Sequence, residues 1–331
     1  MGQGITFAIA GSGVYLPETT ISAEDLDWLT ALPPGTVAFR FGIERRHIAN
    51  PHETSSMMGA RAAEAALAEA GWDRRSLDVI IGACGVMEQP IPGTAVLIQK
   101  RLGLGHSGIW AFDVNATCLS FLVAFDRVLA GFALGTWRRA LIVSADIASA
   151  ALDYGDPEAS VLFGDGAAAI VLEAGGPHQC LAQDFRTYGE AADACTLAAG
   201  GTRLRPHDDI AAFLAQARFR MDGPAVFRAT ARYFPGFLEA LLKRSGVPAE
   251  AIDLIVPHQA SAAALEHLKR SLPGGHDRTV DIYATIGNQI ATSLPFALHV
   301  ARRDGRLKSD ETALLVGSAA GISLGGAVIR W

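Results

Sequence analysis

Two separated stretches of the chain match two later stretches at one common offset. Residues 70–85 (AGWDRRSLDVIIGACG) align without gaps on residues 245–260 (SGVPAEAIDLIVPHQA), an offset of 175 positions. At the same offset, residues 118–122 (CLSFL) fall on residues 293–297 (SLPFA). A repeat at one fixed offset in a chain of 331 residues predicts a fold built from two similar halves.

Each matched unit has the pattern of an amphipathic helix, a turn and an apolar strand. We expect helices over residues 60–70 and 234–244, and strands over residues 79–81 and 254–256. Unbroken apolar strands after helices are typical of βαβ units whose strands are covered on both faces. The predicted fold class is therefore α/β with a largely parallel sheet. Any two unrelated βαβ units would share part of this pattern, which is the alternative explanation.

The repeat divides the chain into three parts. We expect an N-terminal half over residues 1–174, a connection over residues 175–223 that adds to the substrate site, and a C-terminal half over residues 224–331. Within the connection, residues 186–209 are rich in Gly, Asp, Thr and Pro. This composition predicts loops or irregular structure near the mouth of a site.

Composition narrows the class of protein. Half of the residues are hydrophobic, 19% are charged and 35 are glycine, which indicates a packed globular enzyme. The net charge of −6 argues against nucleic acid or an anionic membrane as a partner. The four cysteines lack CxxC spacing, so we expect neither a disulfide framework nor a metal site.

The N-terminal sequence predicts no membrane association. It lacks the pattern of a signal peptide, and no later run approaches the roughly 18 apolar residues needed to span a bilayer. Gly2 and Thr6 match a lipidation pattern, but residues 5–9 have the pattern of a buried strand. We therefore expect an unlipidated cytoplasmic protein.

Cys118 is the candidate nucleophile. It follows the strand-like residues 111–114 and opens an apolar helical pattern. The unpaired N–H groups at a helix start carry partial positive charge, which lowers the pKa of a nearby thiol and favours the nucleophilic thiolate. The alternative is a buried structural cysteine.

His258 and Asn288 are candidate hydrogen-bond donors to a developing anion. His258 follows the strand at residues 254–256, and the ends of parallel strands commonly supply catalytic groups. Asn288 lies in a glycine-containing turn that precedes the helix expected near Ser293. A neutral imidazole and an amide can both donate to an oxygen that becomes anionic. A core histidine and a turn-forming asparagine are the alternatives for each residue alone.

A second oxyanion site is expected from backbone N–H groups. The glycine-rich loop at residues 317–321 can place the amide of Ala320 or Gly321 opposite that of Cys118. Two such donors would stabilise the tetrahedral intermediate of acyl transfer. Glycine-rich strand ends also occur for packing reasons alone.

With Cys118, His258 and Asn288 in this order on a duplicated chain, the sequence resembles β-ketoacyl-acyl carrier protein synthase III, a condensing enzyme of the thiolase superfamily. The resemblance implies a duplicated, five-layered αβαβα thiolase-like fold and a homodimer. It covers nearly the whole chain, and the matching segments are RFGIERRHIA (40–49), IQKRLGL (98–104), AFDVNATCLSF (111–121), SVLFGDGAAA (160–169), VPHQAS (256–261) and GNQIATSLP (287–295).

The resemblance also implies a two-stage reaction. Cys118 takes an acyl group from a thioester of coenzyme A or acyl carrier protein. A malonyl thioester then loses CO2, and the resulting enolate attacks the acyl-enzyme. His258 and Asn288 hydrogen-bond the malonyl thioester oxygen, and no metal or redox cofactor takes part. The product would enter fatty-acid or secondary-metabolite synthesis.

Several positions depart from the family pattern. Thr36 stands where relatives have a Trp that stacks on the adenine of coenzyme A, and Ala263 stands where they have an Arg that docks the carrier protein. These departures favour a specialised starter-unit enzyme over a housekeeping one. Lys269 and Arg270 are the remaining candidates for carrier-protein docking. A solvated helix face is the alternative explanation for these two charges.

The resemblance assigns substrate contacts to Arg40, Ile91 and Ser261. Ile91 holds a place often occupied by Phe, which predicts an altered acyl pocket, and Ser261 holds a place often occupied by Asn.

Other reaction types remain open. Glu88 is a candidate second base for condensation without decarboxylation, with an exposed loop carboxylate as the alternative. Acyl transfer to an alcohol or amine, a Cys-His thioester hydrolase and an inactive partner subunit are the other hypotheses.

Overall fold

The computed structural model describes residues 4–331, so Gly2 of the lipidation pattern lies outside the described residues. The strands are β1 (Ile5–Tyr15), β2 (Thr20–Ser22), β3 (Arg45–His47), β4 (Val79–Gly82), β5 (Trp110–Asp113), β6 (Arg139–Asp146), β7 (Gly166–Ala174), β8 (His178–Thr187), β9 (Cys195–Thr196), β10 (Arg220–Met221), β11 (Leu254–Pro257), β12 (Thr312–Ala319) and β13 (Ser323–Arg330). The helices are α1 (Ala23–Leu29), α2 (Thr36–Phe41), α3 (Ser55–Ala70), α4 (Thr94–Arg101), α5 (Ser120–Ala133), α6 (Pro157–Ser160), α7 (Ile210–Gln216), α8 (Gly223–Ser245), α9 (Ala262–Ser271), α10 (Gly275–Arg278), α11 (Tyr283–Ile286) and α12 (Ser293–Arg303).

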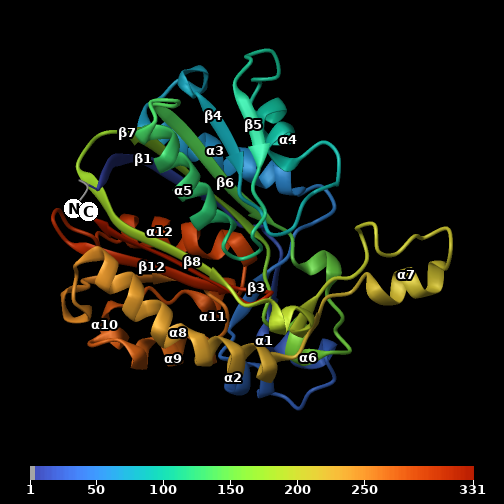
Figure 1. The fold of residues 1–331 in the computed structure, drawn as a ribbon. Coiled ribbons are helices and arrows are strands. Elements are labelled where there is room, and N and C mark those ends of the chain that lie inside the picture. Colours follow the sequence, from blue (N-terminus) through green and yellow to red (C-terminus); the bar gives the residue numbers. More distant parts are fainter. Residues whose placement is uncertain (1–3) are drawn as a thin grey trace.

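Nine strands form one mixed sheet in the order β11-β12-β13-β8-β1-β7-β6-β4-β5 (Figure 1). The pairs β4–β5, β4–β6 and β11–β12 are parallel. The other five neighbouring pairs are antiparallel, so the expectation of a largely parallel sheet was wrong. Only residues 320–322 separate β12 from β13, which is too short for the crossover that a parallel pair requires.

The two halves repeat the same arrangement. The order β4-β6-β7-β1 of the first half recurs as β11-β12-β13-β8 in the second. Strands β4 and β11 begin 175 residues apart and follow the matched helices α3 and α8. Ile255 of β11 also forms a parallel bridge with Thr279, at the place where β4 pairs with β5 in the first half. The predicted duplication is therefore confirmed.

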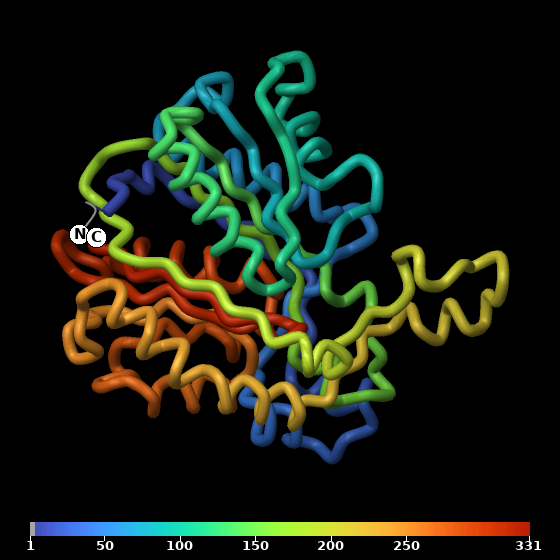
Figure 2. The backbone as a smooth tube through the Cα atoms, viewed as in Figure 1, coloured from blue at the N-terminus to red at the C-terminus, as the bar shows by residue number. Residues whose placement is uncertain are grey.

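Strand β8 lies within the stretch expected to be a connection. It pairs with β13 as β1 pairs with β7, so residues 178–187 are a core strand of the second half. The boundaries at 174 and 224 remain predictions. Beyond β8, the chain to residue 209 is mostly irregular, and α7 then extends away from the body (Figure 2).

The matched helices end in the same way. Both α3 and α8 are followed by a glycine in the left-handed region, Gly71 with φ +66° and Gly246 with φ +71°. Residues with a Cβ rarely adopt this conformation, so glycine at the matched positions ends each helix at the same place. At its start, α8 is capped by the Asp222 carboxylate, which accepts from the Ala225 N–H at 2.9 Å.

Three apolar clusters build the five layers (Figure 1). One cluster packs α3 and α4 against the first half of the sheet, and another packs α8 and α9 against the second. The third places α5 and α12 between the two halves, with side chains from both. The structure thus has the predicted α/β thiolase-like layering. Within residues 4–331, no helix is long and apolar enough to cross a bilayer.

Candidate active site

A cavity of about 1030 Å³ brings together the three predicted catalytic residues. Cys118 comes from the turn before α5, His258 from the end of β11, and Asn288 from the turn after α11. The nucleophile therefore belongs to the first half of the fold and the two candidate donors belong to the second.

The turn before α5 is held tightly. Thr117 has φ +50°, a conformation that is uncommon for a residue with a side chain and that occurs often at functional sites. Its N–H donates to Asn115 Oδ1 at 2.9 Å, and the Ser120 hydroxyl donates to the Thr117 carbonyl at 2.7 Å. These contacts place Cys118 two residues before the first residue of α5.

Burial raises the pKa of the Cys118 thiol to about 12, and the nearby Asp146 and Cys195 add to this shift. The backbone amides of Cys118 and Ala320 act in the opposite direction and lower the pKa, but their effect is smaller. The expected lowering of this pKa was therefore wrong, because burial disfavours the thiolate more than the amides favour it. The thiol is neutral at rest.

His258 is held as a neutral imidazole. Its backbone N–H donates to the Val316 carbonyl at 2.9 Å, and its side chain is only 4% exposed. Burial lowers the pKa of His258 to about 4. Gly317 makes room for the ring, since a Cβ at Gly317 would lie 2.8 Å from the His258 Cβ. At neutral pH the ring can donate one hydrogen bond without carrying charge.

The low pKa of His258 predicts acid sensitivity. Between about pH 6.5 and pH 4 the unfolded chain binds a proton at this residue and the folded chain does not, so acidification favours unfolding. Over this window His258 should remove about 3 kcal/mol from the free energy of unfolding. We expect His258→Gln to remove that loss in urea unfolding at pH 7 and pH 4.5. The exposed control His52→Gln should match wild type, and an unchanged acid loss in His258→Gln would contradict the assignment.

Asn288 is fixed through its side-chain amide. Nδ2 donates to the Ala260 carbonyl at 3.2 Å, and Oδ1 accepts from the Ile290 N–H at 2.9 Å. The Ala260 N–H in turn donates to the His258 carbonyl at 3.0 Å, so Ala260 links Asn288 to His258 through hydrogen bonds. A side-chain amide has two N–H donors, and the second of Asn288 is not used by Ala260.

Asp146 is a functional candidate that the sequence analysis missed. It is fully buried at the end of β6 and accepts from the N–H groups of Gly85 and Val86 at 2.8 Å and from the N–H and hydroxyl of Thr292 at 3.1 Å. Burial raises the pKa of Asp146 to about 6. The carboxylate joins the two halves of the fold beside Cys118. A polar residue at the end of an apolar strand, the signal used for His258, could have identified it.

Two of the three predicted substrate contacts line the cavity, and the third does not. Arg40 and Ser261 line the cavity, whereas Ile91 does not and is 86% exposed. Arg40 forms an ion pair with Glu158, which also lines the cavity. The Ser261 hydroxyl caps α9 by accepting from the Ala264 N–H at 3.2 Å. A contact by Ile91 with substrate would therefore need a second copy of the chain.

The remaining predicted residues have partners within the chain. Glu88 lines the cavity, but its carboxylate accepts from the Ser56 N–H at 2.6 Å.

Lys269 pairs with Asp281 and Arg270 with Glu266, each at 2.7 Å, so carrier-protein docking would compete with these ion pairs. Gly321 is absent from the cavity lining among residues 4–331, whereas Ala320 is present.

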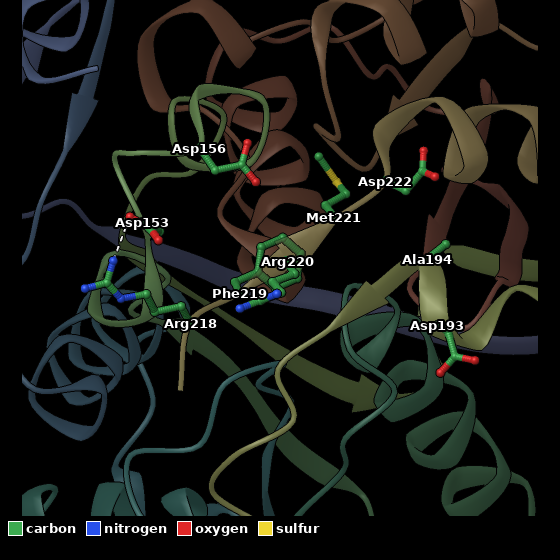
Figure 3. Close-up of a pocket in the computed structure, with 9 residues that line it drawn as sticks. All are labelled: Asp153, Asp156, Asp193, Ala194, Arg218, Phe219, Arg220, Met221 and Asp222. Carbon is green, nitrogen blue, oxygen red and sulfur yellow. Dashed lines mark ion pairs between the residues drawn. The ribbon is translucent and has the colours of Figure 1, made fainter. Parts of the chain in front are cut away.

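A smaller cavity of about 310 Å³ is lined in part by the two residues of β10, Arg220 and Met221 (Figure 3). Phe219 and Met221 line both cavities, so they form the wall between them. Arg218 pairs with Asp153 at 2.7 Å in this smaller cavity. Within residues 4–331, no three His, Cys, Asp or Glu side chains are grouped as metal ligands would be.

Comparison with known proteins agrees with this geometry. The family model described as 3-oxoacyl-[acyl-carrier-protein (ACP)] synthase III matches residues 112–189, and the model of its C terminal matches residues 242–331. The chain is similar to β-ketoacyl-[acyl-carrier-protein] synthase III of Bordetella petrii, with 35% identity covering 100% of both chains. It is also similar to the enzyme of that name from Laribacter hongkongensis, with 33% identity covering 98% of both chains.

Solved structures of similar proteins share the fold of this chain. The 3-oxoacyl-(acyl carrier protein) synthase III (FabH) of Pseudomonas aeruginosa matches with a TM-score of 0.87 and 33% identity over 98% of both chains. OleA of Xanthomonas campestris matches with a TM-score of 0.86 over 100% of both chains, but its identity of 19% shows the fold alone. The fold, the matched family models and the full-length relatives together show that the chain belongs to the β-ketoacyl-acyl carrier protein synthase III family of condensing acyltransferases.

Proposed function

We propose that this enzyme loads an acyl group onto Cys118 and condenses it with a malonyl thioester. The observation that carries the proposal is the meeting of Cys118, His258 and Asn288 in one cavity, which Ala320 also lines. Two sets of donors are then available in one site. One set consists of the backbone N–H groups of Cys118 and Ala320, and the other consists of the side chains of His258 and Asn288.

The first stage is acyl transfer. The Cys118 sulfur forms a bond to the acyl carbon of a donor thioester, and the bond from that carbon to the donor sulfur breaks. The proton of the neutral Cys118 thiol ends on the departing thiol. The amides of Cys118 and Ala320 would hydrogen-bond the oxyanion of the tetrahedral intermediate, because both act on the sulfur to which that carbon becomes bonded.

The second stage is decarboxylative condensation. The bond between the malonyl α-carbon and its carboxylate breaks, CO2 leaves, and the electron pair forms an enolate on the thioester oxygen. His258 and the second N–H of Asn288 would donate to that oxygen as its charge develops. The α-carbon then attacks the acyl carbonyl, and the bond to Cys118 breaks with its electron pair on the sulfur. The sulfur takes up one proton from water to restore the thiol, and a β-ketoacyl thioester leaves. A neutral imidazole can perform this task, since its single N–H donates to the oxygen without a buried charge on the ring.

The substrates are proposed to be thioesters of acyl carrier protein or coenzyme A. The full-length relatives are named for acyl carrier protein. The cavity is large enough for an acyl chain beside the thioester arm, and Phe227, Phe234 and Leu268 contribute apolar lining. With Thr36 and Ala263 in place of the expected Trp and Arg, a specialised starter-unit role in the cytoplasm is proposed.

A homodimer is proposed as the working form. Ile91 projects into solvent at 86% exposure although relatives use this position in the acyl pocket, and Trp110 on the edge strand β5 is 54% exposed. A second copy could cover both side chains.

Glu88 supports a second candidate reaction, condensation without decarboxylation, because it lines the cavity with Cys118. In that case its carboxylate would have to leave the Ser56 N–H to remove an α-proton.

Intact-protein mass spectrometry tests the proposal. Wild type and Cys118→Ala are mixed with acyl thioesters of coenzyme A and carrier protein, with and without a malonyl thioester. We expect an acyl adduct on wild type alone, which disappears on malonyl addition as a β-ketoacyl product forms. Loss of the adduct to water without a condensed product would indicate a hydrolase. Condensation of two acyl thioesters without malonyl would indicate the Glu88-dependent reaction, and no adduct would refute Cys118 as the nucleophile.

A further inference from the structure

Arg46 of β3 is a buried cation that the proposed reaction does not use. Its side chain is only 1% exposed. Within residues 4–331, it neither lines the active-site cavity nor forms an ion pair, and its Nη2 is buried without a hydrogen-bond partner. A charge is costly to bury, and apolar side chains in place of buried charges are often no less stable. Overall stability therefore gives no reason for a guanidinium at this position.

The guanidinium of Arg46 joins two segments that are far apart in the chain. Nε donates to the Val161 carbonyl at 3.3 Å. Nη1 donates to the carbonyls of Tyr283 at 3.0 Å and Ala284 at 3.2 Å, both in α11, which lies beside β3 (Figure 1). The last carbonyls of a helix lack partners inside the helix, and an arginine can supply donors to them. Arg46 therefore ties α11 to the segment that begins at Val161.

The same guanidinium packs against the glycine that precedes Asn288. A Cβ at Gly287 would lie 2.6 Å from Arg46 Cδ, which is closer than two carbon atoms can approach. Gly287 also has φ +74°, a conformation that residues with a Cβ rarely adopt. The turn that leads into Asn288 is therefore shaped around the Arg46 side chain.

Both segments that Arg46 contacts hold the backbone of Asn288. The Asn288 N–H donates to the Leu162 carbonyl at 2.9 Å, and the Asn288 carbonyl accepts from the Gly164 N–H at 3.1 Å. Asn288 is thus paired with the segment after Val161 and continuous with the turn at Gly287. A displacement of about 1 Å in a catalytic group can lower a rate about 100-fold. Movement of either segment would displace the Asn288 side chain in this way.

We propose that Arg46 is a positioning residue for condensation, which holds the turn of Asn288 so that its side-chain amide reaches the malonyl thioester oxygen. The inference rests on the proposed function, because that function assigns Asn288 to the second stage. Arg46 itself touches no substrate. Cys118 lies in a different turn, before α5, and its acylation does not depend on Asn288. Loss of the guanidinium should therefore slow condensation and leave acylation unchanged.

Two variants and one control test the inference. Arg46→Met removes the guanidinium and fills much of its space, whereas Arg46→Lys keeps the charge without the planar set of donors. Arg45→Met, at the exposed neighbouring residue, is the matched control. The two α11 carbonyls each keep a second hydrogen bond from a backbone N–H at 2.9 Å, so we expect both variants to fold. Thermal unfolding checks this expectation.

We expect Arg46→Met to lower the rate of condensation with a malonyl thioester about 10- to 100-fold, and Arg46→Lys to lower it less. The rate of acyl adduct formation should stay at the wild-type level in both. In the Asn288→Ala background, Arg46→Met should cause no further loss, because Arg46 is proposed to act through Asn288. A general structural defect would instead slow both stages and add to the effect of Asn288→Ala.

Hydrogen-exchange mass spectrometry gives a second readout that needs no substrate. Residues 283–288 should exchange faster in Arg46→Met than in wild type, because the Arg46 hydrogen bonds to α11 are lost. Residues 115–120, which hold Cys118, should exchange at the wild-type rate. Arg45→Met should match wild type in both segments.

Equal slowing of the two stages, an additive loss in the double variant, or wild-type condensation in Arg46→Met would overturn the inference. If Arg46→Met does not fold, Arg46→Lys is taken through the same measurements. Failure of both variants to fold would show that Arg46 holds the fold as a whole, which also overturns its assignment to Asn288. Failure of the proposed function would appear differently, as wild type that forms no acyl adduct or forms an adduct without a condensed product.

Discussion

Replacing His258 with alanine should lower the rate of condensation by about 10²- to 10³-fold while Cys118 is still acylated. A neutral imidazole that donates to the enolate oxygen stabilises charge that exists only in the second stage, and loss of one such donor typically has this effect. The acylation stage relies on the backbone amides of Cys118 and Ala320, which the substitution leaves in place. Slow condensation together with unchanged acylation of Cys118 is therefore the result that the proposed role of His258 predicts.

The measurement is a pair of rates on the same protein. Quench-flow mass spectrometry gives the rate of acyl adduct formation, and product analysis with a malonyl thioester gives the rate of condensation. Asn288→Ala should behave like His258→Ala, because both side chains are proposed to donate to the same oxygen. His52→Ala, at an exposed site away from the cavity lining, is the control. If His258→Ala slowed acylation as much as condensation, the assignment of His258 to the second stage would be wrong.

Replacing Asp146 with alanine should reduce the free energy of unfolding by about 3–5 kcal/mol. The carboxylate accepts four hydrogen bonds, from Gly85, Val86 and twice from Thr292, in a site with no exposure to solvent. Its removal leaves the N–H groups of Gly85, Val86 and Thr292 unsatisfied, and the Thr292 hydroxyl keeps only its longer contact with the Gly166 carbonyl at 3.5 Å. Each unsatisfied group costs about 1 kcal/mol or more. The two halves of the fold would also lose a direct link beside Cys118.

Urea unfolding followed by tryptophan fluorescence measures this effect. Asp208→Ala, which removes an exposed carboxylate from the turn before α7, should change the free energy of unfolding by less than about 0.5 kcal/mol. Asp146→Asn should be intermediate, since an amide oxygen still accepts hydrogen bonds while its NH2 group clashes with a backbone donor. A stable Asp146→Ala variant would show that the Gly85 and Thr292 segments are held by packing alone.

Local sequence patterns were sufficient to predict the features that depend only on residues within one segment. The apolar strands at residues 79–81 and 254–256 were predicted because fully covered strands require continuous apolar side chains. The turn motifs around Cys118 and Asn288 predicted residues that the fold then places in one cavity. Helix starts were predicted less well, since α3 and α8 begin at residues 55 and 223, several positions before the apolar periodicity becomes clear.

Contacts between distant segments were beyond the reach of such patterns. The sign of the pKa shift at Cys118 depends on burial by both halves and on Asp146, none of which lies in its own motif. The ion pair of Lys269 with Asp281 links α9 to the segment before α11, and carrier-protein docking by Lys269 stays a prediction.

The sequence by itself determined the duplicated α/β fold and the three residues proposed to carry the chemistry, because a repeat and short motifs are properties of neighbouring positions along the chain. The tertiary structure decided the mixed strand directions, the place of β8 between β13 and β1, and the raised pKa of Cys118. These features arise from the packing of segments far apart in the chain, and burial and hydrogen-bond partners exist only once that packing has formed.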